Sequence, residues 1–286
     1  MKSKSYEGFM KGIFMISAMM SILAIILICF FIFAGGIPFI KDYGLKEFLL
    51  GTQWKPSNSP PSFGILPMIM GSLYVTVGAI AIGVPIGILT ATYLSKFCGR
   101  RLYAFLKPSI NLMSGIPSII YGFFALTVIV PIMRDVFGGT GMNIITASIL
   151  LGIMILPTII GMSEASIRAV PETYYEGSVA LGATHERAVM SVILPAARSG
   201  ILSSVILGIG RAIGETMAVI LVAGNQARMP AGLTKGIRTL TTNIVIEMAY
   251  AADTHREALI ATAAVLFIFI LIINGLFMIL KRRGIR

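Results

Sequence analysis

The chain has 286 residues, of which 56% are hydrophobic and only 12% are charged, and its mean hydropathy is +0.90. A soluble domain carries about 25% charged residues, so this composition excludes an ordinary soluble enzyme or binding domain and predicts a membrane protein. The net charge is +11, but the basic residues lie beside apolar runs instead of on a soluble basic face, which argues against nucleic-acid binding.

Six apolar stretches are each long enough to cross a hydrocarbon core about 30 Å thick. Because an open strand would leave backbone groups unpaired in lipid, these stretches are predicted to be helices. They lie near residues 13–35, 66–94, 109–131, 143–163, 200–223 and 258–280. The predicted fold class is therefore an all-α membrane protein, a polytopic bundle of about six transmembrane helices in the lipid bilayer.

The connecting segments predict the orientation of the chain. The segments on the same side as both termini carry 14 Lys and Arg residues, whereas the opposite loops carry 8 spread over longer segments. Loops rich in Lys and Arg stay in the cytoplasm, so both termini are predicted to be cytoplasmic, in the plasma membrane. We expect a cytoplasmic tail at residues 1–12 and a single transmembrane domain at residues 13–286.

The first apolar run follows three lysines, as in a signal peptide, but it is too long and lacks a small-residue cleavage site. It is predicted to be a retained span. An external loop is predicted at residues 37–64, where Pro56, Pro60 and Pro61 argue against regular helix. Trp54 in this loop is expected to rest on the membrane surface.

Three spans contain glycine and proline motifs: GVPIG around Pro85, SGIPSIIYG around Pro117 and ILPTIIG around Pro157. In transporters, such interruptions free backbone groups beside a pathway near the membrane midplane. An ordinary kink accommodated by neighbouring helices is the alternative. The polar residues near the second motif favour a polar path, and they are Asn111, Ser114, Ser118 and Tyr121.

The loop between spans four and five, at about residues 165–198, contains the sequence VPETYYEGSVALGATHERAVMSVILP. Pro171 and Glu172 suit a helix start. Gly182 is expected to adopt the left-handed conformation that ends a short helix. Thr184 is then expected to cap a second short helix that runs to about residue 194. The loop is predicted to form two short helices that project into the cytoplasm.

This segment resembles the coupling loop of ABC importer permeases, which has the form E-A-A, three residues, G, nine residues, I-x-L-P. The matching residues are Glu176, Gly177, Ser178, Gly182, Val192, Leu194 and Pro195. Two small residues replace the alanines, and a valine replaces the isoleucine. The resemblance implies the type I ABC importer permease fold, in which this loop docks into a groove on a soluble ATPase. We call residues 165–198 the coupling loop.

Further segments resemble the phosphate-import permeases of the PstC type: GRAIGETMAV at 210–219, SGIPSIIYG at 114–122 and IRTLTTNIVIEMAYA at 237–251. This resemblance implies a PstA-like second permease, a dimer of PstB-like ATP-binding subunits, a PstS-like extracytoplasmic binding protein, and phosphate as the substrate. The chain has no G-x-x-x-x-G-K-[ST] motif, so we expect a partner chain to hydrolyse ATP and this chain to be a transport subunit without catalysis of its own.

Two charges interrupt the fifth apolar stretch. A charged side chain at the centre of a transmembrane helix raises the free energy of membrane insertion by about 2.5 to 3.5 kcal/mol. We therefore expect Arg211 and Glu215 to have a specific partner or role. Four residues apart, they are expected to share one helix face and to pair, with Gly208, Gly210 and Gly214 allowing another helix to approach. We expect Arg211 to attract the passing anion and Glu215 to keep it from being held too tightly. The alternative is a pair that only ties this helix to a neighbour.

Within the external loop at residues 225–257, the stretch GLTKGIRTLTTNIVIEMAYA at 232–251 is predicted to form an amphipathic helix. Its apolar residues recur at helical spacing and are Leu233, Ile237, Leu240, Ile244 and Met248.

The cysteines and histidines give no metal signal. Cys29, Cys98, His185 and His255 lack ligand-spaced companions, so we expect no metal and no cofactor. The two histidines are predicted to be solvated polar residues. No Ser/His/Asp arrangement indicates catalysis.

Two alternatives remain open at the level of sequence. In the first alternative, the transported anion is molybdate, tungstate or sulfate instead of phosphate. Sequence leaves this choice open because Arg and Glu do not specify which tetrahedral oxyanion passes. In the second alternative, the bundle mainly signals phosphate status to a kinase and does not chiefly transport the anion.

Overall fold

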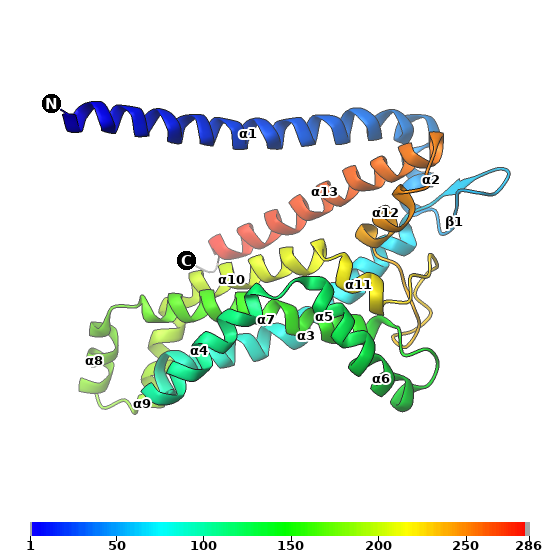
Figure 1. Ribbon diagram of the computed structural model, residues 1–286. Helices are drawn as coiled ribbons and strands as arrows, with labels where there is room; N and C mark the ends of the chain where they lie inside the picture. The colour runs from blue at the N-terminus through cyan, green and yellow to red at the C-terminus, as the bar shows by residue number, and fades with distance from the viewer. Residues whose placement is uncertain (1, 284–286) are drawn as a thin grey trace.

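The computed structural model describes residues 2–283, with side chains described for residues 7–276, 278 and 279. Its helices are α1 (Lys2–Tyr43), α2 (Leu45–Leu50), α3 (Leu66–Thr92), α4 (Arg100–Gly115), α5 (Ser118–Phe124), α6 (Val130–Phe137), α7 (Ile144–Arg168), α8 (Glu172–Ala180), α9 (His185–Ala188), α10 (Leu194–Gly214), α11 (Met217–Val222), α12 (Leu240–Met248) and α13 (Asp253–Arg283) (Figure 1). Three π-helical turns interrupt them, namely η1 (Tyr93–Phe97), η2 (Ala125–Ile129) and η3 (Val189–Ile193). A small antiparallel hairpin pairs β1 (Trp54–Lys55) with β2 (Ser62–Phe63).

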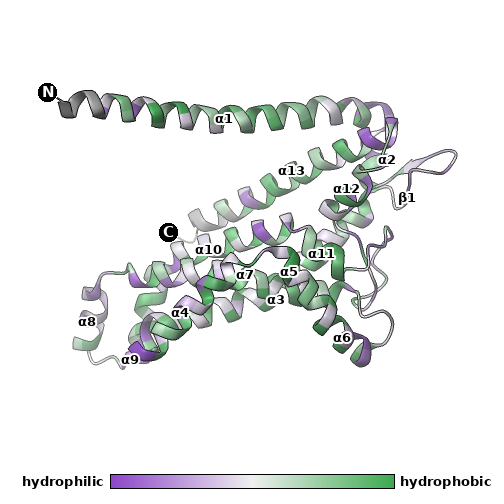
Figure 2. Cartoon of the chain, viewed as in Figure 1, coloured by the Kyte–Doolittle hydropathy of each residue, from purple (hydrophilic) through white to green (hydrophobic). Residues whose placement is uncertain are grey.

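Six helices in the described part of the chain are long and apolar enough to cross a membrane, as the sequence predicts. They are Glu7–Tyr43, Leu66–Phe97, Ser118–Phe137, Ile144–Arg168, His185–Gly214 and Asp253–Leu276. Figure 2 shows that apolar residues dominate the long helices. Phe31, Leu89 and Phe105 are among the large side chains that point outward without cover. Such a surface is unfavourable in water and suits contact with lipid or with other membrane helices.

The predicted boundaries of the third and fifth spans are wrong. Residues 109–131 do not form one helix, because α4 ends at Gly115 and α5 begins at Ser118. Between them Ile116 is extended, with φ −72° and ψ 126°, as expected for a residue that precedes a proline. The fifth span breaks after Gly214, and α11 follows as a separate short helix. By contrast, Pro85 and Pro157 lie inside α3 and α7 without ending them.

The second helix of the coupling loop also differs from its prediction. It does not end near residue 194, because α9, η3 and α10 form one continuous apolar helix, His185–Gly214. Pro195 lacks a backbone N–H and cannot make the usual bond inside a helix. The π-helical turn η3 ends at Ile193, two residues before Pro195, and the helix continues through the proline as α10.

The predicted external loop at residues 37–64 is helical in its first part, which corrects the prediction. Helix α1 continues through Pro38 to Tyr43, and α2 follows after one residue. The other prolines lie in the hairpin, after β1, where no helix forms. Trp54 does not rest on a membrane surface: it is only 6% exposed and its ring packs edge-on against Phe63.

The predicted amphipathic helix in the second external loop is shorter than expected. Only Leu240–Met248 is helical, and it begins at Thr239, whose hydroxyl caps the Thr242 N–H. The preceding residues 225–239 are not helical, and within them Ile237 makes a backbone bridge to Gly224.

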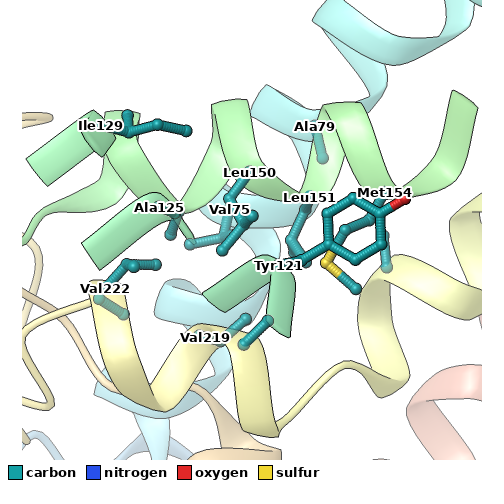
Figure 3. Packing of buried hydrophobic residues seen from close by; sticks show 14 of the residues in the cluster. Val75, Ala79, Tyr121, Ala125, Ile129, Leu150, Leu151, Met154, Val219 and Val222 are labelled. Carbon is teal, nitrogen blue, oxygen red and sulfur yellow. The ribbon is translucent and has the colours of Figure 1, made fainter. Parts of the chain in front are cut away.

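The core of the bundle is centred on α7, which packs along α3 and α10. Figure 3 shows Leu150, Leu151 and Met154 of α7 packed among side chains of α3, α5 and α11. The bundle has two ends. We call the one that carries α8 and α9 the α8 end, and the one that carries α2, α12 and the hairpin the α12 end. The described termini both lie toward the α8 end (Figure 1).

Parts of two predictions fall outside the described residues. The predicted tail at residues 1–12 includes Met1, and the predicted domain at 13–286 includes residues 284–286, with Arg286 among the basic residues that set the expected orientation.

Candidate functional site

Arg211 lies in the last turn of α10 and its side chain is half-buried. Its Nη1 donates a hydrogen bond to Oγ1 of Thr158 on α7, with 3.2 Å between the two atoms. Among the described residues, no carboxylate forms an ion pair with Arg211. An arginine without a counter-charge in a largely apolar span is unusual and indicates a functional position.

The predicted pairing of Arg211 with Glu215 is wrong. The helix ends at Gly214, and Glu215 is extended, with φ −69° and ψ 133°. Its Oε1 instead accepts a hydrogen bond of 3.1 Å from the backbone N–H of Ala218 and so caps α11. Its carbonyl accepts one from Thr241 at 3.0 Å. The helical spacing on which the pairing depended does not exist across this break.

The two charges also face different cavities. Arg211 lines a cavity of about 780 Å³ between α7, α10 and α13, within the size range of ligand sites. Its other polar lining residues are Thr158, Ser203 and Asn274, and the rest of the wall is mostly apolar. Glu215 lines a separate cavity of about 10 Å³, which has room for about one water molecule.

The glycines that flank the two charges have different environments. A Cβ on Gly208 would lie 3.0 Å from Ile159, so this glycine allows α10 to approach α7 closely, as predicted. Around Gly210 and Gly214 there is open space. The predicted close approach therefore holds at one of the three positions within the described chain.

The helix break at Pro117 carries the other predicted path residues. Ser114 is exposed and its Oγ donates to the carbonyl of Asn111 at 2.6 Å. The Tyr121 hydroxyl bridges the break by donating to the carbonyl of Met113 at 2.8 Å. Tyr121 is buried in the core. Ser118 is half-buried in the first turn of α5.

The turn of the coupling loop confirms two local predictions. Gly182 has φ +87°, a left-handed conformation that glycine adopts without strain. Thr184 caps the next helix by accepting a hydrogen bond from the Arg187 N–H at 3.4 Å. Between the two helices the side chain of Leu181 is 91% exposed, so the tip of the loop presents an apolar residue that nothing in the described chain covers.

The other motif residues of the coupling loop differ in burial. Glu176, Gly177 and Pro195 are exposed, and Val192 and Leu194 are half-buried. The Ser178 Oγ is buried and has no hydrogen-bond partner among the described residues.

His185 attaches the coupling loop to the bundle, and the prediction of a solvated residue is wrong for it. One ring nitrogen lies 2.9 Å from the Tyr175 hydroxyl, and the other lies 3.0 Å from the carbonyl of Lys96. The Lys96 ammonium lies 3.4 Å from the Glu172 carboxylate, which adds a contact between α8 and η1. These contacts connect α8, α9 and η1.

A buried carboxylate lies next to this attachment. Glu164 on α7 is only 2% exposed and accepts hydrogen bonds from three donors: Tyr103 at 2.7 Å, Lys107 at 2.5 Å and Arg168 at 2.9 Å. The bond to the carboxylate raises the pKa of Tyr103 above its ordinary value. Arg168 also donates to the carbonyl of Leu94 at 2.9 Å. We call these side chains the Glu164 cluster, which joins α4, α7 and η1.

A second buried carboxylate lies at the α12 end. Glu247 is 5% exposed and binds Trp54 Nε1 at 2.8 Å, His255 Nε2 at 2.8 Å and the guanidinium of Arg238. Arg238 also donates to Asn243 at 3.0 Å. The prediction that His255 is a solvated residue is therefore wrong. These side chains, the Glu247 cluster, join α12, α13 and the hairpin.

Sequence reasoning missed both clusters as well as Asn274. Each glutamate lies at or beyond the edge of an apolar stretch, where a charge needs no special partner, so nothing in the local pattern marks it. Asn274 is the more visible signal, because an amide inside an apolar stretch is costly without a partner. Among the described residues, no group of three or more His, Cys, Asp and Glu side chains is arranged to hold a metal ion.

The chain is similar in sequence to known membrane transport proteins. The family model described as "Binding-protein-dependent transport system inner membrane component" matches residues 83–286. The chain is 36% identical over 268 residues to the "Probable ABC transporter permease protein YqgH" of Bacillus subtilis, covering 91% of this chain and 87% of that protein. It is 32% identical over 263 residues to the "Phosphate transport system permease protein PstC" of Mesorhizobium japonicum, covering 85% and 80%.

A solved structure has the same fold. The bacterial alginate ABC transporter, crystallised with an alginate pentasaccharide-bound periplasmic protein, contains a chain that superposes with a TM-score of 0.61 at 18% identity. The superposition covers 96% of each chain. At this identity the likeness concerns the fold alone.

Proposed function

Because the chain belongs to the family of binding-protein-dependent transport system inner membrane components, we propose that it is the PstC-type permease subunit of an ATP-driven phosphate importer. The observation that carries the proposal is the similarity to a named phosphate permease over most of both chains. The relatives favour phosphate over molybdate, tungstate and sulfate, and favour transport over a mainly signalling role.

The coupling loop is the proposed contact with the ATPase. Leu181 supports this role, because an apolar side chain that is 91% exposed at a tight turn suits a groove on a partner protein. The attachment of His185 to Lys96 and of Arg168 to Leu94 offers a route from the loop to η1, which lies between α3 and α4. ATP hydrolysis is assigned to a PstB-like dimer, because this chain has no phosphate-binding loop.

The other proposed partners follow from the same role. A PstA-like permease would form the translocation path together with this chain, and a PstS-like protein would deliver phosphate from outside. We propose that the α8 end and both termini lie in the cytoplasm, since the basic residues concentrate there. The α12 end would then face the PstS-like protein.

The proposed anion path passes Arg211. Its guanidinium offers planar donors that suit the oxygens of phosphate, and it lines a cavity and forms no ion pair with the described residues. Ser114 and Ser118, at the Pro117 break, are proposed to lie along the same path, and Tyr121 to hold the break in shape through its bond to Met113. Glu215 is proposed to act on the path indirectly, by fixing the start of α11 next to Arg211.

Reconstituted transport tests the proposal. The chain is coexpressed with the second permease and the ATPase, placed in proteoliposomes, and supplied with the binding protein. We expect saturable, ATP-dependent uptake of radiolabelled phosphate that excess sulfate, molybdate or tungstate does not reduce. A nonhydrolysable ATP analogue serves as the control. Uptake of another oxyanion in place of phosphate would contradict the assignment of the substrate, and full assembly without uptake of any anion would favour the signalling role.

A further inference from the structure

The cavity at Arg211 contains polar groups from three helices. Thr158 lies on α7, Arg211 on α10 and Asn274 on α13, and all three line the same space of about 780 Å³. Ser203 is a fourth polar lining residue, but its Oγ donates its only proton to the carbonyl of Ser199 at 2.8 Å. Thr158 and Asn274 are therefore the uncharged side chains with protons to offer in this cavity.

These three side chains have more donors than acceptors between them. A guanidinium has five N–H donors, and the structure pairs one nitrogen of Arg211 with the Thr158 hydroxyl oxygen. Since Thr158 accepts that bond, its own proton remains to be donated. The Asn274 amide has no hydrogen-bond partner among the described residues and offers two further N–H donors. A surplus of donors matches a ligand whose oxygens are mainly acceptors, such as an oxyanion.

We propose that Thr158 and Asn274 complete an anion-binding site around Arg211, which holds a tetrahedral oxyanion in transit. The identity of that anion as phosphate rests on the proposed function. The apolar remainder of the wall strengthens the interaction of these donors with a charge. The cavity is much larger than one ion, so the anion is held on one side only. This suits transit, because conduction requires a site that an ion can also leave.

A thiol reporter in the same cavity tests the site without relying on transport. Cys29 and Cys98 are free thiols and are replaced by serine, and Met278→Cys provides one reactive thiol among the lining residues. The rate at which a negatively charged methanethiosulfonate reagent modifies this thiol is measured in the assembled complex, with and without phosphate. We expect phosphate to slow the modification by occupying the site.

The variants then test the two new residues. Thr158→Val and Asn274→Leu keep the side-chain shape and remove the donors, so each is expected to raise the phosphate concentration needed for protection by about ten- to hundredfold. Asn274→Asp adds a negative charge and is expected to have a larger effect than Asn274→Leu. Met162→Leu, which changes an apolar residue of the same wall, is the matched control and should leave protection unchanged.

The possible outcomes test the existence of the site and the identity of its ligand separately. Protection by sulfate or molybdate but not by phosphate, lost in Asn274→Leu, would support the site and contradict phosphate as the ligand. Phosphate protection that is unchanged in both Thr158→Val and Asn274→Leu would overturn the inference and leave the proposed function standing. Absence of protection by every oxyanion would also overturn it. If Asn274→Leu does not assemble, Asn274→Ser is used, and unchanged protection in that variant likewise overturns the inference.

Discussion

Buried charges are paired at the two ends of the bundle and are incompletely paired in its middle. At each end a buried carboxylate, Glu164 or Glu247, is surrounded by three donors from several elements. In the middle, Arg211 has one bond to Thr158 and faces an open cavity. A fully paired buried charge contributes to structure, whereas an incompletely paired charge in an apolar wall can bind a ligand. We therefore propose that the two clusters stabilise the fold and that Arg211 acts in transport.

The largest expected effect on stability is at the Glu247 cluster. Glu247→Ala leaves the Arg238 charge buried, with its side chain only 14% exposed, and should lower the free energy of unfolding by about 3 to 5 kcal/mol. Thermal unfolding of the purified chain measures the effect as a fall in Tm. Glu257→Ala, at an exposed site on α13, is the matched control. An unchanged Tm for Glu247→Ala would show that the Glu247 cluster at the α12 end does not stabilise the fold.

The Glu164 cluster should be less sensitive to the same change. In Glu164→Ala the partners Lys107 and Arg168 can reach solvent, since their side chains are 27% and 45% exposed. We expect a loss of about 1 to 3 kcal/mol in the free energy of unfolding. Glu172→Ala removes a pair with Lys96 in which the carboxylate is 62% exposed, and it should cost less than about 1 kcal/mol. Equal Tm values for the two variants would show that burial of Glu164 adds no stability.

A change at Gly182 should affect coupling and leave both clusters intact. The left-handed conformation strains a β-branched residue but is accessible to asparagine. Gly182→Ile is therefore expected to reduce phosphate uptake per ATP hydrolysed by about tenfold, which corresponds to about 1.4 kcal/mol of backbone strain. Gly182→Asn should retain most of the coupling. Normal coupling in Gly182→Ile would mean that the shape of the turn does not matter.

The smallest effect is expected at Glu215. Gln keeps the oxygen that accepts the Ala218 N–H, so Glu215→Gln should change the free energy of unfolding by less than about 1 kcal/mol and leave uptake near normal. Uptake and Tm are measured on the same preparation. A large loss of uptake at unchanged Tm would show that the negative charge itself acts on the anion.

Local signals in the sequence predicted local structure. The left-handed turn at Gly182 and the cap at Thr184 depend on a few adjacent residues, and both are confirmed. The six spans follow from apolar runs, because lipid imposes helices on them. The resemblance of the coupling loop predicts the family, and the match to the family model confirms it.

The site depended on features that the sequence does not display. The break after Gly214 separates Arg211 from Glu215, and no proline marks it. The Glu247 cluster joins residues as far apart as Trp54 and Glu247, a pairing that only tertiary folding creates. The cavity around Arg211 likewise needs three helices from different parts of the chain. Such partners cannot be read from spacing along one helix.

The most direct test of the account is Arg211→Ala in the assembled complex, measured both for ATP-driven phosphate uptake and for thermal unfolding. Because Arg211 has one hydrogen bond in the described structure and no ion pair there, we predict normal assembly and an unchanged Tm, with uptake lost. A lowered Tm with loss of assembly would contradict the account and make Arg211 a structural residue, and normal uptake with normal assembly would remove it from the anion path.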